Sequence, residues 1–267
     1  MLSYPLLGQS FREIRKLFLL FAVLMTGFCA LWLGIYHPGI TDTLQALTAA
    51  LPKRLLAAFG CDFSRGSLTE FAAFGLFGFV FLLLPLLYEV LAAGRLIASG
   101  IDSGLFVYLL ATPQARETIA CTRGICVAGS TGLLFLLTGV CAGICVRVRM
   151  PGQLSWEIFW QLLIGCFCLH GLLGGMAFFA ACRAKHFRSF VLTGVCIPVA
   201  FLLLHMAAAL GGTWEILRYV TVFSLFDIEA ILAREGISFL YMGILCVGAG
   251  IFYALGVNSF RKRDLAI

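Results

Sequence analysis

RLIASGIDSGLFVYLLATPQARETIACTR, residues 95–123, separates two long apolar runs and is itself too polar to cross a membrane. Asp102 predicts the start of a short helix, because its side-chain oxygens can accept hydrogen bonds from the free N–H groups of a first turn. Thr112 stands before a proline and is pushed out of the α region, so this helix ends at Ala111. Pro113 is typical of the first position of a helix, so a second helix follows with Thr112 as its cap. The stretch therefore predicts a helical corner.

This corner combines an apolar face with basic flanks. Its leucines and phenylalanine recur at i, i+4 spacing on the short helix, and Arg95, Arg116 and Arg123 flank them. Such a face left in water would promote aggregation. We therefore expect residues 95–118 to dock onto another protein on the cytoplasmic side. The candidate contact residues are Asp102, Leu105, Phe106, Leu109, Leu110, Thr112, Pro113 and Arg116.

The composition indicates the class of protein. Of the 267 residues 61% are hydrophobic and 12% are charged, whereas soluble domains are about half apolar and about a quarter charged. Several apolar runs exceed the roughly 20 residues that a helix needs to cross a bilayer. The chain is therefore predicted to be an all-α polytopic membrane protein with one transmembrane domain over residues 1–267. The net charge of +6 then reflects topology and contact with anionic membrane lipid, and no nucleic-acid partner is expected.

Six transmembrane helices are expected. The segment ahead of the first one, residues 1–16, mixes charged with apolar residues, which favours an amphipathic helix lying in the membrane interface. A basic flank that only fixes the orientation explains this segment equally well. The expected spans are residues 17–36, 71–93, 124–146, 158–182, 190–210 and 237–257.

Two outer segments are expected to carry helices of their own. Residues 44–59, within the loop 37–70, have apolar residues at helical spacing and predict a helix on the outer surface. Residues 211–236 are too charged to span the membrane and too apolar to lie free in water. We expect them to form short helices at the outer interface or re-entering it.

The distribution of basic residues predicts the orientation. With the N-terminus inside, twelve of the nineteen Lys and Arg residues fall in inner segments and seven in the outer loops, which are longer in total. The positive-inside rule therefore places both termini of this multi-pass chain in the cytoplasm of a cell-membrane protein. The inner residues are Arg12, Arg15, Lys16, Arg95, Arg116, Arg123, Arg183, Lys185, Arg188, Arg261, Lys262 and Arg263.

Three ionisable residues fall within predicted spans. Glu89, His170 and His205 are candidates for a pathway or for buried polar contacts, because a charge in the membrane is costly and functional by default. A local polar contact with Arg95 or a headgroup position explains Glu89 as well. Buried, hydrogen-bonded histidines are likewise common. Pro85 is expected to bend the second span, because proline removes a helical hydrogen bond.

Cysteines and small residues are expected to serve packing. Most of the eleven cysteines lie inside apolar runs, where a thiol packs as a small hydrophobe, and their spacing gives no zinc motif. Gly171 and Gly175 in the fourth span, like Gly139 and Gly143 in the third, have the spacing that lets helix backbones approach closely.

Motifs of soluble catalysis are missing from the sequence. It has no phosphate-binding loop, no nucleophile elbow, no zinc-binding helix, and no soluble region long enough for a nucleotide-binding domain. The chain is therefore not expected to be an enzyme. If it moves a substrate against a gradient, the energy comes from a partner or from an ion.

Several motifs together resemble the integral-membrane permease subunits of type-2 ABC transporters, which are exporters. The most specific is the corner LLATPQAR at 109–116. Weaker ones are REIRK at 12–16, LIA at 96–98 leading to Asp102 and Gly104, the outer-loop pattern from Leu51-Pro to Phe59-Gly60, and FRKRDL at 260–265. They extend over nearly the whole chain. The family often carries acidic residues just after the LIA stretch, whereas this chain has Ser99, Gly100 and Ile101 before Asp102.

The resemblance implies a fold, partners and a site. The corner would be a coupling helix between spans two and three that contacts a cytoplasmic ABC ATPase, present in two copies that bind ATP and Mg. A second permease subunit, identical or different, would complete the exporter, and the chain itself would bind no cofactor and no metal. Leu109, Leu110, Thr112, Pro113 and Arg116 would lie at the ATPase contact.

Two alternatives stay open. One is an intramembrane enzyme that uses Glu89, His170 or His205, although these residues fall in three different spans. The other is an ion-coupled carrier, or a membrane scaffold without a transport role. The transported substrate and the faces that line its pathway do not follow from the sequence.

Overall fold

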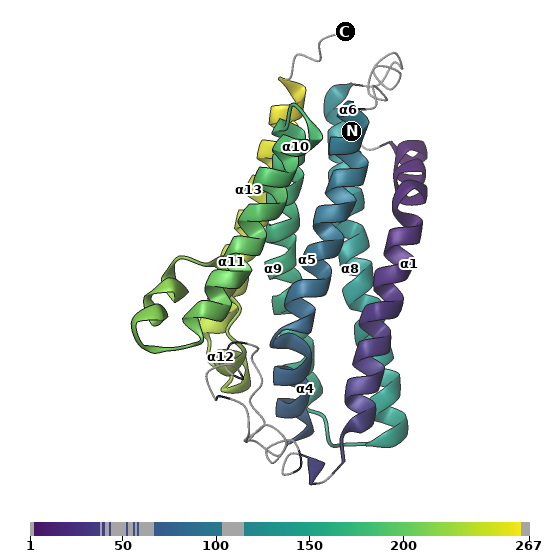
Figure 1. Cartoon of the computed structure of the whole chain (residues 1–267). Coiled ribbons are helices and arrows are strands. Elements are labelled where there is room, and N and C mark those ends of the chain that lie inside the picture. The colour runs from purple at the N-terminus through teal and green to yellow at the C-terminus, as the bar shows by residue number, and fades with distance from the viewer. Residues whose placement is uncertain are drawn as a thin grey trace.

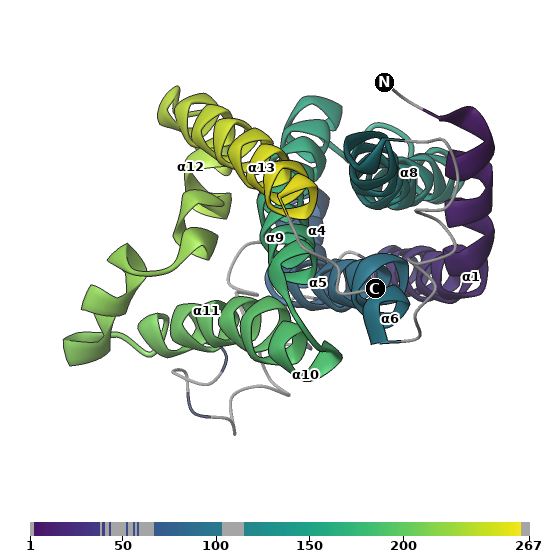
Figure 2. The ribbon, with the colours of Figure 1, turned by 90° about the horizontal axis from the view of Figure 1, so that it is seen from above.

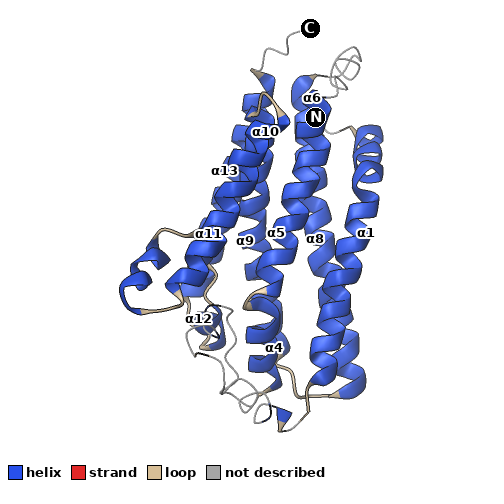
Figure 3. Cartoon of the chain, in the orientation of Figure 1, coloured by secondary structure: helices blue, strands red, loops and turns tan. Residues whose placement is uncertain are grey.

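The computed structural model describes residues 3–37, 67–102 and 115–262, with residues 39, 40, 43, 52, 56 and 58 of the first long loop. This described part is helical and contains no strand (Figure 3). Six helical runs are long and apolar enough to cross a membrane, and each overlaps one expected span. The chain therefore fits a multi-pass membrane protein. The runs are Tyr4–Ile35, Leu68–Ala98, Arg116–Arg149, Trp156–Arg183, Phe187–Ala208 and Ile237–Arg261.

The first helix, α1 (Tyr4–Ile35), differs from the expectation of a separate interfacial helix over 1–16, because it continues into the span without a break. Its first turns nevertheless cross α8 (Arg116–Arg149), the helix of the third span. The Ser3 backbone N–H donates to Thr122 Oγ1 at 3.3 Å, and Glu13 Oε1 lies 4.0 Å from Arg123 Nη2. Ser3, just before α1, and Glu13 within it thus contact neighbouring residues of another helix. Figure 2 shows these turns along one edge of the bundle, beside α8.

The second span consists of several segments. Helix α4 (Leu68–Phe77) begins with Ser67, whose hydroxyl accepts from the Glu70 N–H, and a turn at 78–79 separates it from α5 (Val80–Ala93). The π-helical segment η1 (Gly94–Ala98) and α6 (Ser99–Asp102) continue α5. The break precedes Pro85, the residue that was expected to bend this span.

The third and fourth spans, α8 (Arg116–Arg149) and α9 (Trp156–Arg183), are joined by a short turn. Of the glycines in the two expected pairs, Gly139 and Gly175 lie at close helix contacts, whereas a Cβ on Gly143 or Gly171 would make only ordinary contacts. A Cβ on Gly175 would lie 3.3 Å from the Ala249 carbonyl oxygen in α13, and one on Gly139 would lie 2.7 Å from Leu163 Cδ2 in α9. A larger residue at Gly175 would press on the α13 backbone, whereas at Gly139 the Leu163 side chain would have to move.

The fifth span combines α10 (Phe187–Phe190), the π-helical segment η2 (Val191–Val195) and α11 (Cys196–Ala208). Three short helices follow, as the mixed composition of residues 211–236 predicted: η3 (Gly212–Tyr219), η4 (Val222–Leu225) and α12 (Ile228–Leu232). The last span is α13 (Ile237–Arg261).

The six runs are arranged around α5 and α9. In the view from above these two helices are central, α1 lies at one edge, and α11 with the following short helices lies at the other (Figure 2). In the apolar membrane-length stretch of α9, 72% of the residues are buried, against 11% in that of α13. The exposed apolar faces of α1, α11 and α13 are the surfaces that lipid or another chain would cover.

The two ends of the bundle differ. One end carries the start of α1, the end of α6, the start of α8, the α9–α10 connection and the end of α13 (Figure 1). The other end carries the start of α4, the α8–α9 turn and α12. All the described residues of the predicted inner set lie on segments at or near the first end. We call this end the basic end.

Candidate functional site

A buried carboxylate–imidazole pair lies between α5 and α9. Glu89 and His170, 1% and 0% exposed, face one another, with Glu89 Oε2 3.3 Å from His170 Nδ1. The other ring nitrogen, Nε2, lies 2.9 Å from the Phe81 carbonyl oxygen. Two of the three ionisable residues singled out in the sequence are thus brought together, and Glu89 is buried inside the bundle rather than exposed at its surface.

The Phe81 carbonyl is available because of Pro85. A proline inside a helix has no N–H to donate to the carbonyl four residues earlier, and this is the carbonyl of Phe81. In a membrane span such a freed carbonyl needs another donor. His170 provides one, and the thiol of Cys166, one turn earlier in α9, also donates to this oxygen at 3.5 Å.

These contacts constrain the protons of the pair. A carbonyl only accepts, so Nε2 of His170 carries a hydrogen. Nδ1 then either accepts from a protonated Glu89 or, in the imidazolium form, donates to the carboxylate. In both states the contact between Glu89 and His170 contains one proton, and the states differ only in which atom holds it. The pair is chemically able to hold and pass on a proton.

Gly174 and Tyr253 lie next to the Glu89–His170 pair. A Cβ built on Gly174 would lie 3.1 Å from the Tyr253 hydroxyl and 3.3 Å from Glu89 Oε1, so a glycine leaves room for both groups. Tyr253 also lines a cavity of about 330 Å³ between α8 and α13. Its side chain therefore extends from the edge of Glu89 to a pocket at the bundle surface.

The arrangement is unlike a nucleophile–base pair of an enzyme. Cys166 and His170 both donate to the Phe81 carbonyl rather than to one another, whereas a thiol nucleophile needs the base as its hydrogen-bond partner. Among the described residues, no group of three or more His, Cys, Asp or Glu could hold a metal ion.

His205 belongs to a different part of the fold. It lies in α11, where its ring centroid is 5.8 Å from that of Phe223 in η4, and its buried Nδ1 makes no hydrogen bond with a described residue. The three ionisable residues therefore do not form one site.

The predicted docking residues fall largely outside the described part of the chain. Asp102 is the last residue of α6 and Arg116 the first of α8, where it is half-buried. Both lie at the basic end (Figure 1). The residues outside the described ranges are Leu105, Phe106, Leu109, Leu110, Thr112 and Pro113.

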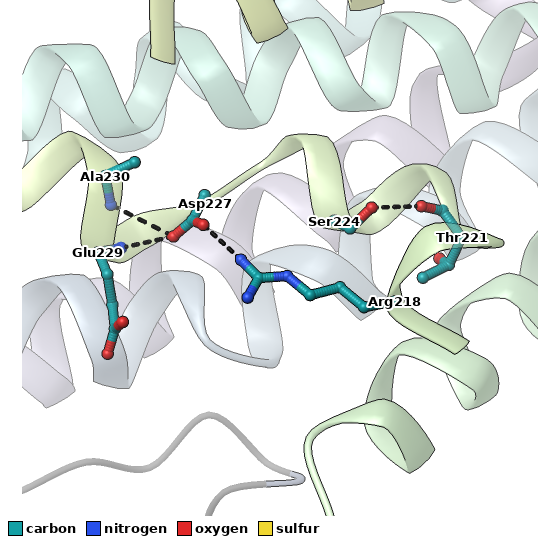
Figure 4. A network of polar contacts seen from close by, with 6 residues as sticks. All are labelled: Arg218, Thr221, Ser224, Asp227, Glu229 and Ala230. Atoms are coloured by element: carbon teal, nitrogen blue, oxygen red, sulfur yellow. Dashed lines mark hydrogen bonds and ion pairs between the residues drawn. The ribbon is translucent and has the colours of Figure 1, made fainter. Parts of the chain in front are cut away.

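At the opposite end a polar network fixes the short helices (Figure 4). Asp227 caps α12 by accepting from the N–H groups of Glu229 and Ala230, and its second oxygen pairs with Arg218 of η3. Thr221 links η4 to α11 by donating to the Phe201 carbonyl at 3.1 Å. These contacts serve structure, since they tie η3 to the start of α12 and η4 to α11.

Sequence reasoning missed the partners of the pair, namely the Phe81 carbonyl, Cys166, Gly174 and Tyr253. Only the carbonyl had a signal in the sequence, because Pro85 frees the acceptor four residues before it. The chain matches no protein-family model, and no curated protein sequence is similar to it at a significant level.

Proposed function

We propose that this chain is the membrane-embedded permease subunit of an ATP-driven exporter, coupled to a separate cytoplasmic ATPase. The observation that carries the proposal is the combination of six membrane-length helices with the LLATPQAR corner between the second and third of them. The corner is the most specific part of the resemblance to type-2 ABC permeases.

The described helices would transmit a movement of the corner. The α5–η1–α6 run ends at Asp102 and α8 begins at Arg116, so residues 103–115 join two membrane-length helices directly. A displacement of the corner on ATP binding would tilt both as rigid bodies, as in other alternating rearrangements of packed helices. The partners in this proposal are two ATPase copies with bound ATP and Mg, a second permease subunit and membrane lipid.

Co-purification tests the proposal. We expect a soluble ATPase to co-purify with the chain from its native membrane, and Leu109→Asp to release it while the chain still inserts. The matched control is Val107→Asp, which adds the same charge on the other side of the predicted short helix. Equal ATPase recovery with both variants, or an ATPase missing from the parent preparation, would contradict the proposal.

A second candidate function is a proton-coupled carrier, and the Glu89–His170 pair is the observation that favours it. Glu89→Gln keeps the shape of the side chain but cannot release a proton at neutral pH. In proteoliposomes, a coupled carrier would lose proton flux with this variant while remaining folded. An exporter driven by ATP would keep its ATP-dependent transport, so the same variant distinguishes the two candidates.

A further inference from the structure

A groove lies between the first turns of α1 and the side of α8. Its volume is about 470 Å³. The groove exists because the first turns of α1 cross α8, as the contacts of Ser3 and Glu13 with Thr122 and Arg123 show. The lining residues are Tyr4, Leu7, Gly8, Phe11, Ile125, Cys126, Gly129, Ser130 and Leu133.

The lining favours hydrocarbon. It is almost entirely apolar, and the hydroxyl of Ser130 donates within its own helix, to the Val127 carbonyl at 2.9 Å. Ile125 and Leu133 are 42% and 39% exposed, so the groove is open at the side of the bundle. These positions, residues 125–133, fall in the first half of the expected span 124–146. An apolar groove at that depth faces the acyl region of a bilayer.

Two glycines leave the groove wide. Gly8 lies on the α1 wall and Gly129 on the α8 wall, and a Cβ built on either one would meet nothing within 4 Å. The space beside both glycines is therefore open. The first carbon of an added side chain would meet no neighbour at either position, which makes both suitable for a test.

The rim of the groove is basic. Tyr4, Gly8, Phe11 and Arg15 follow one another at spacings of four, three and four residues, which places Arg15 on the stripe of α1 that lines the groove. Arg12 and Lys16 are exposed on the same segment, whereas the neighbouring acidic residue, Glu13, lies beside Arg123. The segment therefore offers positive charge to the headgroup of whatever fills the groove.

We infer that this groove binds an anionic phospholipid of the leaflet at the basic end, with one acyl chain between Gly8 and Gly129 and the headgroup phosphate at Arg12 and Arg15. The lipid would fill the space under the first turns of α1 and hold them against α8. The inference rests on the groove and its rim alone and does not depend on the exporter proposal.

Photolabelling of the full chain tests the inference. The chain is reconstituted in phosphatidylcholine vesicles that contain a small fraction of a phospholipid with a photoactivatable acyl chain, either phosphatidylglycerol or phosphatidylcholine. Labelled peptides are quantified by mass spectrometry relative to the exposed face of α13. With the phosphatidylglycerol probe, we expect peptides containing Ile125 and Leu133 to be labelled well above this reference, and above their labelling by the phosphatidylcholine probe.

Two kinds of variant separate the acyl chain from the headgroup. Gly129→Leu and Gly8→Leu should each reduce groove labelling to the α13 reference, whereas Gly27→Leu, at an open position farther along α1, should not. Arg12→Gln with Arg15→Gln should reduce the preference for phosphatidylglycerol by about fivefold per residue, since a basic residue near an anionic surface contributes about 1 kcal/mol. Lys185→Gln, exposed elsewhere at the basic end, is the charge control.

The inference would be overturned by groove labelling no higher than the α13 reference in the parent chain. Equal labelling by the two probes would overturn it as well, and so would unchanged labelling in both leucine variants. Two leucine variants on different helices keep the test decisive if one of them fails to fold, which size-exclusion chromatography of each preparation would show.

Discussion

Glu89 shows how a carboxyl group can be accommodated inside an apolar bundle. A charged side chain at the centre of a membrane helix costs about 3 kcal/mol when it enters alone. Here the group meets His170, whose other nitrogen donates to the carbonyl that Pro85 leaves free. Glu89, His170 and the Phe81 carbonyl form one chain of contacts, which satisfies polar groups of both α5 and α9. Removing the carboxyl group would leave a buried ring nitrogen without its partner.

At this scale we predict that Glu89→Leu lowers the stability of the purified chain by about 1 to 2 kcal/mol, because it leaves His170 Nδ1 buried and unsatisfied. Glu89→Gln should remain close to the parent, since its amide can donate to the same nitrogen. The stability of both variants is measured as the midpoint of unfolding, either on titration with a denaturing detergent or on heating. Equal losses in the two variants would show that the contact does not stabilise the fold.

Residue-scale features were only partly predictable from the sequence. Glu89 and His170 stood out as costly residues in apolar runs, but their pairing depends on how α5 and α9 are aligned, which neither run encodes alone. The alternative contact of Glu89 with Arg95 was local and therefore visible in the sequence. The observed partner is far away in the sequence and comes from tertiary packing.

At the scale of elements, the two π-helical segments meet around one aromatic ring. Phe190 is 2% exposed and lies beside Gly94, the first residue of η1, and Gly194 of η2. A Cβ on Gly94 would be 3.0 Å from Phe190 Cε1, and one on Gly194 would be 2.4 Å from Cε2. Both segments lie near the basic end, so the ring links the helix leading to the corner with the helix that follows α9. Wide helical turns of this kind often occur at functional sites.

We predict that Gly194→Ala destabilises the chain by about 1 to 3 kcal/mol, because the new methyl group overpacks the Phe190 ring. Adding Phe190→Leu should restore part of the loss, since neighbouring changes do not add independently. Gly250→Ala, which meets nothing within 4 Å, is the control and should be neutral or stabilising. Thermal unfolding of the four purified proteins gives the comparison. A loss in Gly194→Ala that Phe190→Leu does not reduce would contradict this account.

The sequence predicted the elements better than their ends. Length and hydropathy located all six membrane-length helices, because a run of about 20 apolar residues has few alternatives. The charged residues around Arg12 suggested a boundary near residue 16, but helical hydrogen bonding continues through them, and only the crossing of α8 separates the first turns from the span. Neither π segment had a sequence signal, and their shared contact with Phe190 depends on tertiary packing.

On the scale of the whole molecule, the account depends on which side of the membrane the basic end faces. That end gathers the first turns of α1, the ends of α6 and α13, and the start of α8 (Figure 1). The exporter proposal requires this end to be in the cytoplasm, where an ATPase can reach the corner.

Accessibility to a membrane-impermeant thiol reagent in intact cells tests this most directly. Gln114→Cys lies between α6 and α8, and Gln153→Cys lies on the exposed turn between α8 and α9, at the opposite end. With the parent chain as background, we predict labelling of Gln153→Cys in intact cells and of Gln114→Cys only after permeabilisation. The reverse pattern would place the corner outside the cell and contradict the account.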